Sequence, residues 1–175
     1  TGGVAADIGT GCGCIALALA VEGRFERVVA VERSPAAAAL ARENVALIVP
    51  ATPVEVREGD LLAPLSVAGE RCRVIVSNPP YLTDAEYEAL APAVKHWEPR
   101  EALASGPDGL AATRALFAGA AALLEPLGML IVEIDERRGD AVRQLAHQYG
   151  WRHLAIHDDI FGRARYALAF PGSDA

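Results

Sequence analysis

Short apolar runs alternate with longer helical segments along almost the whole chain, and this alternation restricts the fold more than any other feature. Runs rich in β-branched residues are typical of buried strands, and helical patterns separate most of them. A repeated strand–helix–strand order predicts a parallel sheet with helices on both faces. The expected strands are Val4–Ile8, Arg27–Glu32, 54–57, 73–77 and 129–134, and the expected helices are a segment ending near residue 21 and residues 36–47, 110–124 and 140–149.

Two further strand-like pieces, residues 152–157 and 165–170, close the chain. The gap between them is too short for a helical crossover, so they should pair antiparallel. The sequence therefore predicts an α/β fold with a mostly parallel seven-stranded sheet and a C-terminal antiparallel hairpin. No internal repeat, low-complexity tract or linker divides residues 1–175, which indicates one domain.

A glycine-rich loop, DIGTGCG, connects the first expected strand to the first expected helix. Its glycines allow a tight turn and a close approach to a ligand, and the helix presents free N–H groups and its positive dipole end. The GxGxG spacing differs from the GxGxxG of nicotinamide dinucleotide sites, although that alternative stays open, and the lysine of triphosphate sites is missing. The residues assigned to cofactor binding in this loop are Asp7, Gly9, Thr10, Gly11, Cys12 and Gly13.

Glu32, at the end of the second strand, and Asp60 and Leu61, after the third strand, extend this candidate cofactor site. Glu32 follows Gly9 at a spacing that suits a carboxylate accepting hydrogen bonds from both hydroxyls of a ribose. Asp60 could accept from an adenine amino group, and Leu61 could cover the adenine ring. The alternatives are a solvated carboxylate at the end of a strand for Glu32 and a turn residue for Asp60.

The tetrapeptide Asn78-Pro79-Pro80-Tyr81 directly follows the fourth strand. Ligands bind at the carboxyl ends of parallel strands, so this segment should open onto the same crevice as the glycine loop. The two prolines restrict the backbone, and an Asn side chain both donates and accepts hydrogen bonds. These four residues are therefore the predicted substrate-binding site, with Asn78, Pro79 and Tyr81 as the catalytic candidates; a Pro-Pro turn that merely ends a strand is the alternative.

Composition excludes several other classes of protein. The net charge of −7 and the pI near 5.1 argue against direct binding of nucleic acid, which usually requires a basic face. No apolar stretch approaches the roughly 20 residues of a membrane span, and no secretory signal opens the chain. The cysteines and histidines show no metal-ligand spacing, and sparse thiols are typical of a reducing cytoplasm. The abrupt start at Thr1 indicates a fragment.

Four segments resemble the HemK/PrmC family of protein-(glutamine-N5) methyltransferases: DIGTGCGCIALALA, VSNPPYL, EPREALASGPDGL and FGRARYAL. The resemblance implies a class I, Rossmann-like, S-adenosylmethionine-dependent methyltransferase fold without a metal, and S-adenosylhomocysteine as the product of the cofactor. It also implies a monomeric enzyme that acts on the glutamine of a Gly-Gly-Gln tripeptide in a peptide chain release factor. Gly9 to Gly13, Glu32, Leu61 and Asn78 would line the cofactor, and Asn78 to Tyr81 would hold the glutamine.

The chemistry of an amide explains why these residue types suit that reaction. An amide nitrogen is a poor nucleophile because its lone pair is delocalised into the carbonyl group. The Asn78 side-chain oxygen could accept one N–H of a substrate amide, and the Pro79 carbonyl could accept the other. With both hydrogens fixed, the lone pair would be aimed along one axis, and the rigid backbone preorganises this alignment. Tyr81 could pack against the flat amide.

The chain departs from the family in two places. The helical N-terminal substrate-binding domain and a proline-rich motif before the first strand do not occur in this sequence, and EIDERRGDAV follows the fifth strand where relatives more often have a glycine soon after Glu133. Three alternatives stay open: methylation of a ribosomal protein glutamine, methylation of an adenine amino group in nucleic acid, and an inactive binding module. The intact glycine loop and NPPY segment argue against the inactive module.

Overall fold

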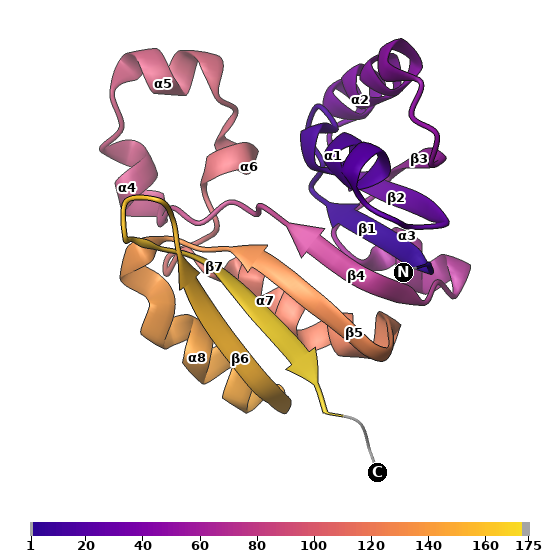
Figure 1. Ribbon diagram of the computed structural model, residues 1–175. Coiled ribbons are helices and arrows are strands. Elements are labelled where there is room, and N and C mark those ends of the chain that lie inside the picture. Colours follow the sequence, from indigo (N-terminus) through magenta and orange to yellow (C-terminus); the bar gives the residue numbers. More distant parts are fainter. Residues whose placement is uncertain (1, 173–175) are drawn as a thin grey trace.

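The computed structural model describes residues 2–172 and contains one seven-stranded sheet with the strand order β3-β2-β1-β4-β5-β7-β6 (Figure 1). The strands are β1 (Val4–Ile8), β2 (Arg27–Glu32), β3 (Val54–Glu58), β4 (Cys72–Ser77), β5 (Leu124–Glu133), β6 (Trp151–Asp158) and β7 (Ala164–Pro171). The helices are α1 (Cys14–Glu22), α2 (Pro35–Ile48), α3 (Ala63–Ala68), α4 (Asp84–Glu88), α5 (Pro92–Trp97), α6 (Arg100–Leu103), α7 (Ala111–Gly119), η1 (Ala120–Leu123), η2 (Glu136–Arg138) and α8 (Gly139–Gln148).

The pairing of the strands confirms the predicted sheet. Strands β1 to β5 pair in parallel, whereas β7 pairs antiparallel with both β5 and β6. From β1 the chain first builds outward through β2 and β3, and it then returns to place β4 on the other side of β1. Ligands of open α/β sheets bind where the strand order reverses in this way. The reversal lies between β1, which leads into the glycine loop, and β4, which leads into Asn78.

Helices cover both faces of the sheet, as the alternating sequence predicts. One core cluster joins a face of the sheet to α3, α7 and α8. A smaller cluster joins the other face to α1, whose buried residues are alanines, and α2 packs beside it against β2 and β3. The small side chains let α1 lie close to β1, which keeps the glycine loop at the edge of the sheet.

The expected helix over residues 110–124 is wrong at its C-terminal end. Helix α7 ends at Gly119, η1 follows, and β5 already begins at Leu124. Pro126 disfavours helical backbone in the residue before it. Residues 125–128 then form an irregularity in β5, because Cys72 pairs with Leu124 and the next pair is Val74 with Met129.

Residues 78–109, for which no regular structure is predicted, contain three short helices. Helix α4 begins with a capping box, in which Thr83 accepts from the Glu86 N–H and the Glu86 carboxylate accepts from the Thr83 N–H. Helices α4, α5 and α6 together form an excursion beyond the carboxyl ends of the strands (Figure 1). Each is too short to give a helical period in the sequence.

Candidate active site

A cavity of about 680 Å³ lies at the carboxyl edge of the sheet. Its volume is within the range of about 300–1,000 Å³ that is typical of small-molecule sites. Residues from the glycine loop, the two following strand ends and the NPPY segment line it together: Gly9, Gly11, Glu32, Asp60, Leu61, Asn78 and Pro80. Motifs that are far apart in the sequence therefore meet around one cavity.

The glycine loop presents backbone rather than side chains to this cavity. Gly9 and Gly11 have φ angles of +72° and +57°, and a Cβ atom at either position would meet no other atom within 4 Å. The positive φ angles favour glycine, and the open space beside both residues leaves room for a ligand to approach the main chain. The Asn44 side chain fixes the loop by donating to the Cys12 carbonyl at 2.8 Å.

Asp7 supports this loop from inside the protein. Its carboxylate is fully buried and accepts from the Thr10 hydroxyl at 2.5 Å and from the Ala16 N–H at 3.0 Å, both through Oδ2. Its Oδ1 has no hydrogen-bond partner among the described residues. Burial is the main cause that raises the pKa of Asp7 from 3.8 to about 6. These contacts assign Asp7 to the loop's support, and it does not line the cavity.

Glu32 combines a structural contact with a free face. Its Oε2 accepts from the Gly11 N–H and its Oε1 from the Ser34 N–H, each at 2.8 Å. Each carboxylate oxygen can accept more than one hydrogen bond, so both retain capacity for a ligand in the cavity. Glu32 thus fixes the glycine loop, and its contact with the hydroxyls of a ribose stays a prediction.

Asp60 and Leu61 form the part of the cavity wall that follows β3. Asp60 is exposed, and Leu61 is half-buried with a φ angle of +45°, a conformation that is uncommon for a residue other than glycine. Leu61 lines the cavity. The role of its side chain as a cover for an adenine ring stays a prediction.

The NPPY segment begins at a fixed point of the sheet. The buried Ser77 hydroxyl donates to the Ile8 carbonyl at 2.7 Å and ties the carboxyl end of β4 to that of β1. Asn78 follows as an exposed residue, and its side-chain amide makes no hydrogen bond within residues 2–172. The carbonyl oxygen of the buried Pro79 also accepts none from the described residues. The Asn78 amide at the cavity wall and the neighbouring Pro79 carbonyl are therefore both without a hydrogen-bond partner among the described residues.

Charged side chains surround Tyr81, the last residue of the segment. Burial raises the pKa of the half-buried Tyr81 phenol, the nearby Glu133 carboxylate raises it further, and Arg165 opposes the shift. Ser77 of β4 pairs with Val132 of β5, so Asn78 and Glu133, the next residue on each chain segment, lie at the same level of the sheet. Burial also raises the pKa of Glu133. Asp135 raises the pKa of Tyr81 as well, so the phenol is influenced by two carboxylates and one guanidinium group from the β5 and β7 side.

The segment around α6 also lines the cavity, which the sequence reasoning did not predict. The lining residues from this part of the chain are Pro99, Glu101, Ala102, Ala104, Ser105 and Gly106. Backbone hydrogen bonds of 2.9 Å from Leu82 to Leu103 and of 2.8 Å from Ser105 to Leu82 hold the segment against the NPPY corner. The sequence carries one signal for this part of the wall, the EPREAL…GPDGL block that resembles the family. This block could have been predicted to line the cavity.

The remaining assigned residues lie around the cavity without lining it. Cys12 is half-buried, Gly13 precedes α1, and Thr10 is buried against Asp7. Pro79 and Tyr81 belong to the corner rather than to the cavity wall. In the part of the chain that the structure describes, no group of three or more His, Cys, Asp or Glu residues could hold a metal ion.

Comparison with known proteins shows the family to which the chain belongs. The sequence model of the family "Methyltransferase small domain" matches residues 1–98. The chain is 43% identical to the "Release factor glutamine methyltransferase" of Cereibacter sphaeroides, covering 93% of this chain and 58% of that protein. It is 45% identical to the protein of the same name from Moorella thermoacetica, covering 94% and 58%. The chain thus spans less than two thirds of the length of these curated relatives.

A solved structure supports the fold independently. A methyltransferase from Pyrococcus furiosus superposes with a TM-score of 0.68 at 20% identity, covering 97% of this chain and 74% of that one. The fold is that of the class I S-adenosylmethionine-dependent methyltransferases, as the sequence predicts. The cavity also fits this cofactor, since open glycine backbone, the Glu32 acceptors and Leu61 line it. The family model covers more than half of the chain, and the chain belongs to the methyltransferase small domain family.

Proposed function

We propose that this chain carries the catalytic site of an enzyme that transfers the methyl group of S-adenosylmethionine to the side-chain amide of a glutamine in a peptide chain release factor. The observation that carries the proposal is the pair of free polar groups at Asn78 and Pro79 beside a cavity lined by the glycine loop. An amide NH₂ has two hydrogens to be fixed, and the corner offers two acceptors side by side.

The corner would act by orienting the substrate nitrogen. S-adenosylmethionine supplies a methyl group on a positively charged sulfur. The substrate nitrogen attacks the methyl carbon in line with the bond from carbon to sulfur. The Asn78 side-chain oxygen accepts one N–H of the glutamine amide, and the Pro79 carbonyl accepts the other. The nitrogen lone pair then points into the cavity. Because Pro79 and Pro80 restrict the backbone, the two acceptors are held in place before the substrate arrives.

The proton balance of the reaction requires no strong base. The new N–C bond forms as the S–C bond breaks, and the methylated nitrogen becomes acidic enough to release one N–H proton to a hydrogen-bonded acceptor. Tyr81 packs at the end of the corner, where its ring can lie against the flat amide. The residues of this chain therefore contribute binding and alignment, which is the main source of rate enhancement for such a transfer.

Two observations favour a release factor as the substrate. The curated relatives at 43% and 45% identity are named release factor glutamine methyltransferases. The net charge of −7 does not suit a nucleic-acid substrate. A ribosomal protein glutamine stays the second candidate, because the corner itself recognises only the amide. A monomer in the cytoplasm stays a prediction; among the described residues, no helix has the length and apolar character needed to cross a membrane.

A methyl-transfer assay with radiolabelled S-adenosylmethionine tests the proposal. The acceptors are an intact release factor, the same protein with the Gln of its Gly-Gly-Gln loop changed to Ala, a ribosomal protein and duplex DNA. We expect label only on the intact release factor. Label on DNA, or equal label on the Gln→Ala protein, would overturn the proposed substrate. A second preparation extended by the N-terminal region of the relatives shows whether that region improves the affinity for the acceptor.

A further inference from the structure

The turn that connects β6 to β7 exposes two large apolar side chains. Ile160 is 92% exposed and Phe161 is 77% exposed. Burial of either side chain against a partner would be favourable, because it removes apolar surface from water. A solvated turn is more often formed by polar residues. Adjacent exposed apolar side chains can form an interaction site where they lie within reach of a partner. We call residues 159–163 the hairpin tip.

The hairpin tip is held in a fixed shape by Asp159. Its Oδ1 accepts from the N–H groups of Phe161 at 2.9 Å and Arg163 at 3.1 Å. The Asp159 N–H donates to the Arg163 carbonyl at 2.8 Å, and Gly162, with a φ angle of +75°, donates back to the Asp159 carbonyl at 3.0 Å. The apolar side chains are therefore presented by an ordered turn, which lowers the entropy lost on binding a partner.

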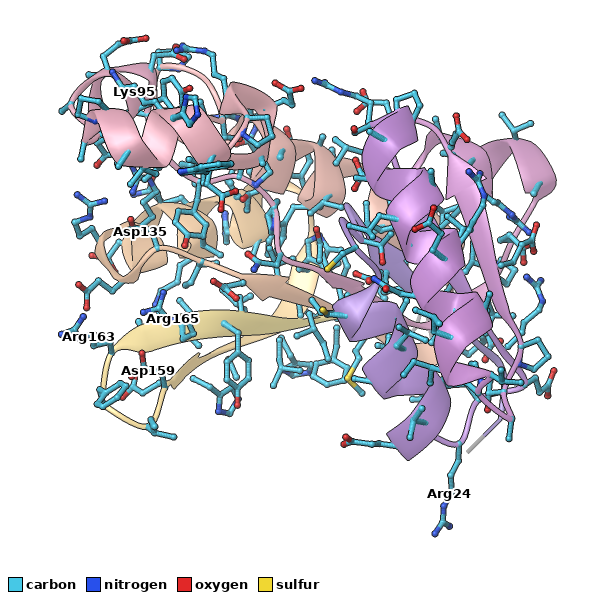
Figure 2. The ribbon with its side chains drawn as sticks, turned by 90° about the horizontal axis from the view of Figure 1, so that it is seen from above. Arg24, Lys95, Asp135, Asp159, Arg163 and Arg165 are labelled. Atoms are coloured by element: carbon cyan, nitrogen blue, oxygen red, sulfur yellow. The ribbon has the colours of Figure 1, made fainter. Side chains whose placement is uncertain are left out.

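The same aspartate connects the hairpin tip to the NPPY corner. Its Oδ2 accepts from Arg165 Nη2 at 3.2 Å, and Arg165 directly precedes Tyr166, which pairs with Glu133 at the level of Asn78. Asp159, Arg163 and Arg165 lie together at one end of the molecule in Figure 2, with Asp135 next to them and Arg24 far away. Figure 1 shows the tip at the same end of the sheet as the excursion that follows the corner, and Figure 2 shows that the two are separated from one another at this end.

The distance between tip and corner fits one partner protein. Strand β7 is the second neighbour of β4 in the sheet, and two strand spacings amount to about 10 Å. An interface of standard size buries about 800 Å² of each protein, which corresponds to a disc of roughly 16 Å radius. Tyr166 of β7 is level with Asn78, because Ser77 pairs with Val132 and Glu133 pairs with Tyr166. Phe161 precedes Tyr166 by a stretch that adds about 16 Å along the strand, so the tip and the corner are roughly 20 Å apart. An interface of this size that is centred between them reaches both.

We propose that the hairpin tip is a docking surface for the protein that presents the glutamine, and that Ile160 and Phe161 pack against an apolar patch beside its glutamine-bearing loop. This inference rests on the proposed function, because it takes the methyl acceptor to be a folded protein. The tip would bind the acceptor without contacting the reacting atoms, so it should affect the affinity for the protein and leave the cofactor site unchanged.

The test compares two double variants that each remove two exposed apolar side chains. Ile160→Ser/Phe161→Ser changes the tip. Leu47→Ser/Val67→Ser is the control, since these residues are 79% and 90% exposed on α2 and α3, which follow β2 and β3 at the other edge of the sheet. The acceptors are an intact release factor and a short peptide with the sequence of its Gly-Gly-Gln loop. The readouts are kcat/KM for each acceptor and the Kd for S-adenosylmethionine.

We expect the tip variant to lose about 10- to 100-fold in kcat/KM on the intact protein, as for central apolar contacts of an interface. Its kcat/KM on the peptide and its cofactor Kd should match those of the wild type, and the control variant should match the wild type on every readout. If the tip variant equals the wild type on the intact protein, or loses equally on both acceptors, the docking surface is refuted while the proposed function stands. If the wild-type chain labels neither acceptor, the proposed function fails first.

Discussion

The buried carboxyl group of Asp7 makes the stability of the fold depend on pH in a way that can be calculated. Burial raises the pKa of Asp7 in the folded chain to about 6, against 3.8 for the ordinary group. Well below its ordinary pKa of 3.8, the group is protonated in both the folded and the unfolded chain. Between pH 4 and 6 the unfolded chain releases the proton first, so the free energy of unfolding falls as the pH rises. The loss reaches its full value of about 3 kcal/mol roughly one pH unit above the folded pKa.

The variant Asp7→Asn isolates this effect because it cannot titrate. Its side-chain oxygen can still accept from the Thr10 hydroxyl and the Ala16 N–H, the two contacts of the native carboxylate. Urea unfolding of both proteins without cofactor, from pH 4 to 7.5, gives the difference in their free energies of unfolding. We expect the wild type to lose stability relative to the variant by about 2.5 kcal/mol over this range, mostly between pH 4 and 6. A difference that stays constant with pH would contradict the raised pKa of the buried Asp7 carboxyl group.

Two further variants, each with a matched control variant, test the support of the NPPY corner and the cofactor site. Gly109→Ala should destabilise the fold by about 2 kcal/mol or more, because its Cβ would lie 2.5 Å from the Tyr81 carbonyl oxygen and its φ is +71°. Gly69→Ala, with a φ of +64° and open space, should cost only about 1 kcal/mol in the same urea experiment, and equal losses would contradict the close approach. Glu32→Gln should raise the cofactor Kd about 10-fold by calorimetry, whereas Glu58→Gln on the exposed end of β3 should leave it unchanged; an unaltered Kd in Glu32→Gln would argue against the ribose contact.

The order of elements was predictable from the sequence because each long element has its own period. The strands at Val4–Ile8 and Arg27–Glu32 agree with the structure at both ends, and the C-terminal hairpin pairs antiparallel as expected. The short helices of residues 78–109 could not be predicted, since two or fewer turns give no amphipathic pattern and capping and tertiary contacts stabilise them. The early start of β5 at Leu124 depends on an irregular pairing with β4 that no local pattern encodes.

The candidate site was predictable as far as it follows from topology. A glycine loop after β1 and a polar corner after β4 must meet where the strand order reverses, and Gly9, Gly11 and Asn78 do line one cavity. Spacing does not tell which loop residues face the ligand and which support the loop. Asp7 shows this, because its burial depends on contacts with Thr10 and Ala16 on the inner side of the turn.

The most direct test of the account is the single-turnover rate of methyl transfer in the variant Asn78→Ala, measured together with its Kd for S-adenosylmethionine. The native Asn78 amide is free of other hydrogen bonds in the described structure, so its removal disturbs no internal contact. If the corner orients the amide of a substrate glutamine, the rate should fall at least about 100-fold while the cofactor Kd stays within about twofold of the wild type. A rate equal to that of the wild type would contradict the central role of this corner.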